Sequence, residues 1–457
     1  MKFMFVCLFI LCVGCAQEST LPSQEAGPAA EPTLAQEMSA QPTDGQLFEE
    51  GRRLQARADF KGAESRYRQA IAVAPSNPQY TFYLGTVLHA TSRYGEARSL
   101  FEEAILLKPD YAAPRIALGK LLYDVDGNSA AASKLLREAL ELAPQAAEAR
   151  YTLALIQLRE GQSEEAIRLF SELVEADSSN AQARTQLGLA YLQQGDIETA
   201  QSELKRATSS QPYYSAAFHG LGQTFIRQGN TLAGQRLLQR AQQLEEQATQ
   251  LTPHQNALRQ NPNQPEAHYN LASMYARFDR LRPAAQHFSK AIALDSTYAL
   301  AYQGLGNLFL RLGTTAEARA NYASRARALY LRALELNSQL AETHNNLGLL
   351  LHRSGDIQTA VQHYEQATVI DPQAGFYQAN LSRAYLDLKQ FPEALQAADK
   401  ALQITPTMTG ARETLGDIYA AQKDWTNALE AWERIDPQDR PSGLTEKIAQ
   451  ARIQNAP

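Results

Sequence analysis

The chain has 457 residues, more than one hydrophobic core usually spans, so it folds as several domains or as a repeat array. Its 43 Lys and Arg residues stand against 49 Asp and Glu residues, which gives a formal net charge of -6. This balance offers no basic surface for nucleic acid, so we expect no nucleic-acid partner.

The first 15 residues have the pattern of a secretory signal. Lys2 precedes an apolar run from Phe3 to Val13, which is too short for a stable membrane-spanning helix. The ending Leu-Cys-Val-Gly-Cys resembles the lipobox of bacterial lipoproteins, although Cys12 stands where that family usually has Leu. The resemblance implies cleavage before Cys15 and attachment of a lipid to its sulfur. The alternative is ordinary secretory cleavage nearby.

The cysteine content agrees with a lipidated terminus. All three cysteines, Cys7, Cys12 and Cys15, lie in the signal segment, so the mature chain has no pair to form a disulfide. Ala16 follows Cys15, and in this it resembles lipoproteins sent to the outer membrane. We therefore expect an exported, envelope-located protein that touches a membrane only through the lipid on Cys15, on the periplasmic side of the outer membrane if the host has one.

Residues 16–43 form a predicted disordered linker. They are rich in Pro, Ala, Ser, Gln and Glu and contain almost no large apolar side chain. Such a composition cannot bury enough surface to offset the entropy of folding. As a flexible tether it would place the rest of the chain at a mean distance of roughly 30 Å from its anchor.

From residue 44 onward the sequence repeats. Leu followed by a small residue recurs with spacings of 34, 35, 34 and 34 residues, and after a gap with spacings of 34, 42, 34 and 34. The pairs are Leu84-Gly85, Leu118-Gly119, Leu153-Ala154, Leu187-Gly188, Leu221-Gly222, Leu271-Ala272, Leu305-Gly306, Leu347-Gly348, Leu381-Ser382 and Leu415-Gly416. An earlier copy has Gly51 in the small position. In most copies an Ala follows twelve residues after the small residue, with a bulky residue four further on.

This pattern resembles that of the tetratricopeptide repeat (TPR) family, and it covers roughly residues 44 to 437. The resemblance implies an all-α solenoid, a right-handed superhelix of about eleven helix-turn-helix units. The small residue of each unit lets its two helices approach closely. Because one unit alone leaves an apolar face in water, neighbouring units must stack to cover it.

Two irregularities and the chain end complete the expected organisation. Units 1–6 occupy residues 44–248 and units 7–11 residues 265–437, while Pro253 and Pro262 in the insertion 249–264 predict a break between two blocks. The spacing of 42 residues in the eighth unit predicts a second helix longer by about two turns. Residues 438–457 are interpreted as a capping helix and tail.

Asparagine recurs at the sixth position of the first helix, which faces away from the packed side. The residues are Asn270, Asn346 and Asn380, while Gly304 interrupts the row and Asn307 lies one turn further along. Amide side chains can hydrogen-bond the backbone of an extended peptide. The row resembles the asparagine ladder of O-linked N-acetylglucosamine transferases, although that ladder is longer. The alternative is that these are ordinary exposed helix residues.

Arginine recurs at the thirteenth position, near the end of the first helix. The residues are Arg159, Arg227, Arg277, Arg311 and Arg353. A row of guanidinium groups beside the asparagines would favour peptides with carboxylates. The alternative is structural, since Arg near a helix C-terminus complements the helix dipole without any ligand.

No motif indicates catalysis. The segment around His344, His352 and His363 follows the repeat, with His344 in a packing position shared with His268 and Tyr302, and it lacks metal-ligand spacing. The acidic stretch from Asp124 to Ser129 fits a plain turn better than a calcium loop. Nucleotide-binding glycine loops and hydrolase or zinc-protease motifs are also missing from the sequence. We expect no enzyme activity, cofactor, metal or small-molecule substrate.

The sequence therefore favours a non-catalytic scaffold that binds a protein or an extended peptide in a concave groove. By fold-level analogy it serves assembly of envelope, pilus or secretion complexes. One alternative is an accessory or substrate-presenting subunit of a separately encoded enzyme such as a glycosyltransferase. A second is a self-associating structural protein.

Overall fold

A computed structural model describes residues 42–312 and 316–455. All regular elements in these ranges are helices, so the predicted all-α repeat array is confirmed. The predicted signal segment with Cys15, and all but the last two residues of the predicted linker, lie outside the described residues.

Each of the eleven units contributes two helices that pack against each other and then against the next unit. The first helices are α2 (Asp44–Ala56), α4 (Pro78–Ala90), α6 (Ala112–Asp124), α8 (Ala147–Arg159), α10 (Ala181–Gln194), α12 (Ser215–Arg227), α14 (Pro265–Arg277), α16 (Ala299–Leu312), α18 (Ala341–Arg353), α20 (Gly375–Asp387) and α22 (Thr409–Ala421). The second helices are α3 (Phe60–Val73), α5 (Tyr94–Leu107), α7 (Ser129–Leu142), α9 (Ser163–Ala176), α11 (Ile197–Ser210), α13 (Thr231–Gln260), α15 (Leu281–Leu294), α17 (Ala316–Leu336), α19 (Ile357–Ile370), α21 (Phe391–Ile404) and α23 (Trp425–Glu433). A 3-10 turn (Pro437–Asp439) and α24 (Leu444–Gln454) follow.

Glycine and polar residues in the short turn between the two helices of a unit determine where these helices end and begin. Gly195 and Gly355 adopt left-handed backbone angles with φ of 95° and 89°, which a residue without Cβ does at little cost. The next residues, Asp196 and Asp356, cap the second helix by accepting a hydrogen bond from a backbone N–H of its first turn.

The small residue of the repeat lies where the two helices of a unit cross. A Cβ atom added to Gly348 would lie 2.7 Å from Cε1 of Tyr364, whose ring is fully buried against the glycine. The same relation holds between Gly416 and Trp432, where the distance to the indole nitrogen would be 2.3 Å. Each large side chain therefore fills the space that the missing Cβ leaves, as the repeat pattern predicts.

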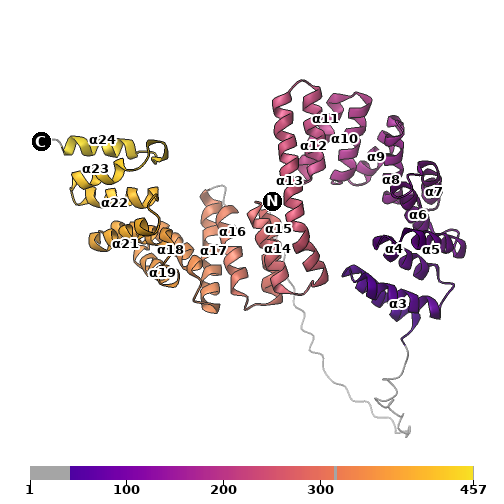
Figure 1. Cartoon of the computed structure of the whole chain (residues 1–457), viewed down its shortest axis with the longest axis horizontal. Helices are drawn as coiled ribbons and strands as arrows, with labels where there is room; N and C mark the ends of the chain where they lie inside the picture. Colours follow the sequence, from indigo (N-terminus) through magenta and orange to yellow (C-terminus); the bar gives the residue numbers. More distant parts are fainter. Residues whose placement is uncertain (1–41, 313–315, 456–457) are drawn as a thin grey trace, which may run out of the picture.

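The stacked units curve into an arc (Figure 1). In its N-terminal half α4, α6 and α8 lie toward the inside of the arc, and their partners α5, α7 and α9 lie outside. We call the inner side of the first helices the inner face. Several consecutive units border the space on this side, so a ligand lying there would touch side chains from consecutive repeats.

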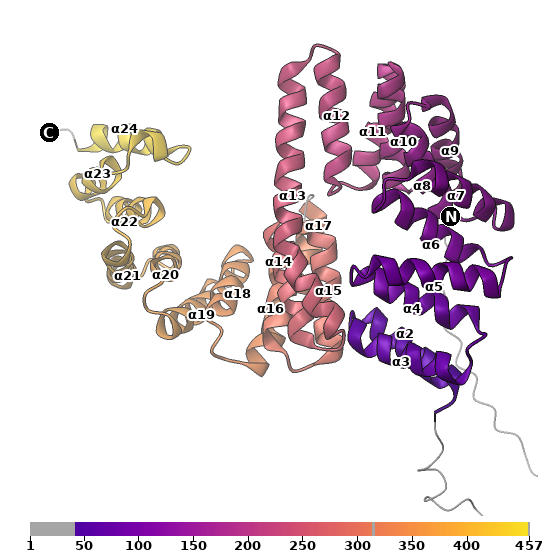
Figure 2. The same cartoon turned by 45° about the vertical axis from the view of Figure 1, so that its right-hand side comes forward.

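The predicted break at Pro253 is not found. Helix α13 runs without interruption from Thr231 to Gln260, and α14 lies against its lower part (Figures 1 and 2). One proline removes a single backbone hydrogen bond, whereas Leu244 and Leu251 continue the buried face of the helix at a seven-residue spacing. The chain turns only at residues 261–264, which contain Pro262.

The longer second helix of the eighth unit and the chain end follow expectation. Helix α17 covers 21 residues where most second helices cover 14, so the insertion in the eighth unit lengthens a helix. At the C-terminal end α24 buries Leu444 and Ile448 beside Trp432, and it covers the apolar side of the last unit. The stretch from Asp124 to Ser129 is a turn in which Gly127 has a φ of 65°.

Candidate protein-binding surface

The inner face is hollowed over units 2 to 5. Two adjoining hollows of about 420 and 230 Å3 lie along α4, α6, α8 and α10. The smaller one is lined by Phe82 and Ile116, and the larger one by Tyr151 and Leu155, among other residues. Both are open to solvent and have mixed walls in which apolar surface predominates, so each can receive one apolar side chain of a ligand.

An ion pair divides the two hollows. Lys120 of α6 lies 2.9 Å from Glu148 of α8, and both residues line both hollows. Because the two side chains are largely exposed, their pairing adds little stability and can open toward polar groups of a ligand. Burial raises the pKa of Tyr151, so its phenol stays a neutral hydrogen-bonding group.

Sequence reasoning did not single out these residues. A signal was present, since Phe82, Ile116 and Tyr151 occupy the fifth position of consecutive first helices, on the side assigned to ligands. Apolar residues at such a position are hard to tell from core residues in a single sequence, because both follow helical periodicity.

The predicted asparagines of units 8 to 10 bond to one another. Asn346 donates to Asn307 over 2.9 Å, and Asn380 donates to Asn345 over 2.7 Å. Asn345 in turn donates to Asn346 over 3.2 Å and is only 4% exposed. These amides therefore join α16, α18 and α20, whereas the helix positions of Asn346 and Asn380 predict exposed amides without partners in the chain. Asn270 is exposed and forms no hydrogen bond to another described side chain or backbone group.

Further polar residues extend this amide network. The hydroxyl of Tyr330 donates to Asn307 over 2.7 Å, and Asn307 donates to Glu342 over 2.9 Å. Gln303 also donates to Glu342, over 2.8 Å, and accepts from Thr343 over 2.7 Å. The network consequently fixes the relative positions of three consecutive first helices before any ligand is present.

The predicted arginines lie near helix C-termini. Arg227 donates to the carbonyl of Leu192 over 2.7 Å, and Arg311 donates to that of Ala276 over 2.8 Å. Each carbonyl belongs to the last turn of the preceding first helix. This is the arrangement expected of the structural alternative, since a cation there complements the helix dipole.

The other three predicted arginines differ in whether their side chains have a partner within the chain. The guanidinium of Arg159 lies 5.7 Å from the ring centroid of Tyr123. Arg277 and Arg353 are exposed and form no hydrogen bond or ion pair within the described part of the chain. These two are the members of the row whose charge is available to a ligand.

Two histidine pairs hold the helices of units 7 and 9 together. Nδ1 of His268 lies 2.9 Å from Nδ1 of His287, and Nδ1 of His344 lies 3.0 Å from Nδ1 of His363. The Nε2 atom of His344 is 3.2 Å from the carbonyl of Ser338 and must donate to it, because a carbonyl only accepts. Burial lowers the pKa of both rings, which favours the neutral pair in which His344 accepts at Nδ1 from His363.

Within residues 42–312 and 316–455, no three His, Cys, Asp or Glu side chains are placed to hold a metal ion. None of the described helices has both the length and the apolar composition needed to cross a bilayer.

Stacked helix pairs, glycine crossings and a hollowed inner face together define a repeat scaffold for protein interactions. Family models described as tetratricopeptide repeat match residues 48–112, 116–181, 255–299 and 379–440, and further such models match 181–214 and 329–362. The chain belongs to the tetratricopeptide repeat family.

Two similar proteins carry the name cellulose synthase operon protein C. The one from Xanthomonas axonopodis pv. citri (strain 306) is 29% identical over 219 residues, which cover 47% of this chain and 14% of the relative. The one from Pseudomonas fluorescens (strain SBW25) is 27% identical over 193 residues, which cover 42% of this chain and 15% of the relative. The matched segments thus span about one seventh of either relative.

Solved structures with a related architecture include YrrB, described as a TPR protein with an unusual peptide-binding site, and the yeast Tom70. YrrB is 19% identical with a TM-score of 0.35, and the match covers 39% of this chain and 92% of that one. Yeast Tom70 is 14% identical with a TM-score of 0.34, and the match covers 90% of this chain and 96% of that one.

Proposed function

We propose that the chain is a non-catalytic scaffold that binds an extended segment of a partner protein along its inner face. A lipid on Cys15 would hold it at a membrane of the bacterial envelope, where it would serve the assembly of envelope, pilus or secretion complexes. The observation that supports peptide binding most is the pair of apolar hollows divided by Lys120 and Glu148.

The spacing of the hollows suggests how the partner binds. Neighbouring packed helices lie roughly 8 to 10 Å apart, and an extended chain advances about 3.3 Å per residue. Two apolar side chains about three residues apart would therefore enter both hollows. The polar groups between them would meet the ion pair, and the fixed first helices of units 8 to 10 would extend the surface.

Site-specific cross-linking in cells tests the proposed groove. A photoreactive amino acid is placed at Ile116, on the inner face, or at Glu103, exposed on the outer helix α5. We expect a defined partner to be captured from the first position only, and Leu155→Glu to reduce that capture by placing a charge in the larger hollow. Equal capture at the two positions would count against the groove.

Incorporation of labelled palmitate tests the anchor. We expect label in the wild-type chain and none in Cys15→Ala, which should also be released from membranes. Label retained in that variant would refute lipidation at this cysteine.

A second candidate function is that of an accessory subunit for a separately encoded glycosyltransferase. It is supported by the two relatives whose name links them to a cellulose synthase operon. Identification of the protein cross-linked through Ile116 separates the candidates, since a captured glycosyltransferase would favour the accessory subunit and a structural envelope component the assembly scaffold.

A further inference from the structure

Arginine caps the second helix in two of the described units, units 2 and 7. In the other units whose N-cap residue the structure describes this position holds Asp, Asn or Gln, whereas here it holds Arg93 and Arg280. A cation at a helix N-terminus adds to the positive end of the helix dipole. A nearby anion would therefore stabilise each of these arginines.

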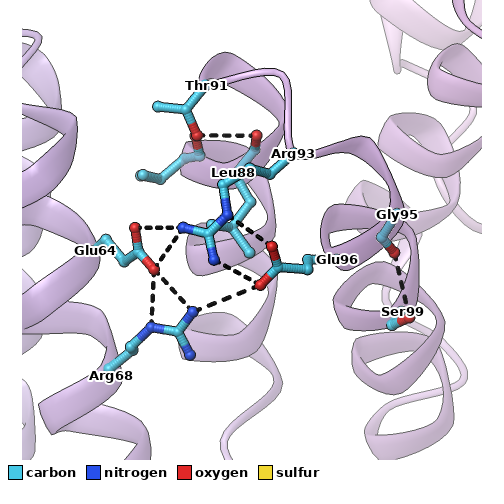
Figure 3. Close-up of polar contacts among 9 residues, drawn as sticks. Glu64, Arg68, Leu88, Thr91, Arg93, Gly95, Glu96 and Ser99 are labelled. Carbon is cyan, nitrogen blue, oxygen red and sulfur yellow. Dashed lines mark hydrogen bonds and ion pairs between the residues drawn. The ribbon is translucent and has the colours of Figure 1, made fainter.

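Unit 2 supplies that anion from its own chain (Figure 3). Nε and Nη2 of Arg93 donate to the two carboxylate oxygens of Glu96 over 2.7 and 2.6 Å, and Nη1 donates to Glu64 over 2.9 Å. Hydrogen bonds from Arg93 lower the pKa of the Glu96 carboxyl. The same two carboxylates also hold Arg68, so two glutamates balance the charge of two arginines near the start of α5 (Figure 3).

Unit 7 lacks both carboxylates. Pro283 stands three residues after Arg280, where Glu96 stands after Arg93, and the first turn of α15 has no acidic residue. The preceding second helix offers the neutral Gln247, whose side-chain oxygen is 3.2 Å from Nη2 of Arg280. Arg280 is nevertheless only 9% exposed, and its Nε has no hydrogen-bond partner among the residues that the structure describes.

The other groups around Arg280 do not neutralise it. The ring of Tyr213 lies 4.5 Å from the guanidinium and stabilises the cation without removing its charge. Asp279 is the nearest acid in sequence, but it is 79% exposed and pairs with Arg311 over 2.8 Å. Burial lowers the pKa of Arg280, and the neighbouring charge of Arg240 acts in the same direction.

We propose that Arg280 anchors a second binding site, which takes a carboxylate side chain from an acidic segment of a partner polypeptide. The carboxylate accepts a hydrogen bond from Nε of Arg280, the atom whose counterpart in unit 2 binds Glu96. Exposed Arg277 and Arg282 flank the turn and hold the acidic residues on either side. Tyr213, on the turn before α12, covers the guanidinium and swings aside on binding.

This site is separate from the hollows over units 2 to 5, and either assignment stands without the other. Long-range attraction by the net charge cannot account for binding of an acidic peptide, because the whole chain carries a formal net charge of -6 and repels such a ligand. Binding of an acidic peptide therefore requires a local site.

Fluorescence anisotropy with labelled octaglutamate on the purified chain tests the site. We expect the wild type to bind, and Arg280→Gln to bind at least about tenfold more weakly, since a buried charged hydrogen bond is removed. Arg93→Gln is the matched control and should bind as the wild type does, because that arginine is occupied internally. Absence of wild-type binding, or equal loss in both variants, overturns the proposal.

A second pair of variants removes the ambiguity of a folding defect. Pro283→Glu places a carboxylate where unit 2 has Glu96, so it should fill the site from within, raise the melting temperature and abolish octaglutamate binding. Gln286→Glu makes the same change in charge at an exposed position of α15 and should leave binding nearly unchanged. Octaglutamate binding to Pro283→Glu with wild-type affinity would overturn the assignment.

Inorganic phosphate distinguishes a polypeptide site from a site for small anions. Phosphate is added at the same concentration as the carboxylate groups of octaglutamate, and we expect it not to displace the peptide. Octaglutamine, which has the same length but no charge, should not bind. Displacement by phosphate would mean that the site takes a free anion, and the polypeptide assignment would fall.

Discussion

The side-chain amide of Asn346 donates a hydrogen bond of 2.9 Å to the side-chain oxygen of Asn307, one unit earlier in the array. That oxygen also accepts from the hydroxyl of Tyr330 over 2.7 Å. The contact joins α18 to α16 and to α17, so an amide that sequence alone assigns to a ligand also stabilises the stack. Its neighbour in the row, Asn270, has no such role.

We expect Asn346→Ala to lower the free energy of unfolding by about 1 kcal/mol, because it removes a hydrogen bond and leaves partly buried partners unpaired. Asn270→Ala should change it by less than about 0.5 kcal/mol. Urea unfolding followed by circular dichroism measures both values. Equal stability of the two variants would show that the amide network contributes nothing.

Gly348→Ala should destabilise the chain by about 1 to 3 kcal/mol, because the added methyl group would overlap the buried ring of Tyr364. The matched control is Gly410→Ala, where nothing lies within 4 Å of the added Cβ. There the higher helix propensity of Ala should leave the melting temperature unchanged or slightly raised. A rise for Gly348→Ala would contradict close helix crossing at this position.

Replacing Pro253 by Ala should raise the melting temperature. Pro253 is exposed inside α13 and has no backbone N–H to donate. Ala restores this donor and favours the helix, so the free energy of unfolding should rise by up to about 3 kcal/mol. Pro78→Ala, at the first position of α4 where proline is favourable, should bring no gain. If both variants melt like the wild type, α13 is not one continuous helix in solution.

The histidine pairs should make stability depend on pH. Burial lowers the pKa of His287, His344 and His363, with further lowering of His363 by His344 and Arg327. The unfolded chain therefore binds more protons than the folded one below about pH 6.5, so stability is lost as the pH falls through this range. We expect a lower melting temperature at about pH 5.5 than at about pH 7.5.

The control for this pH dependence is His352→Gln, since His352 lies outside both pairs and contacts Asp387 over 2.7 Å. His344→Gln combined with His363→Gln should reduce the loss between the two pH values, whatever its effect on absolute stability. An unchanged loss would assign the pH dependence to other groups.

Sequence and structure agree most closely where a residue acts within its own unit. The spacing of Gly348 and Tyr364, and the turn residues Gly355 and Asp356, predict two helices, their crossing and their ends. The prediction at Pro253 was wrong because local helix propensity competes there with burial of Leu251, which depends on a neighbouring unit.

The sequence by itself determined the repeat, the pairing of helices and the face of each first helix that is turned away from the core, because helical periodicity and small residues at crossings act over a few turns. Tertiary structure alone decided which polar groups find partners. Asn346 meets Asn307 in the preceding unit, while Arg280 meets no carboxylate although Arg93 meets two. Pairings between units depend on how neighbouring units stack, whereas a contact within one helix turn, such as that of Arg93 with Glu96, can be expected from local spacing.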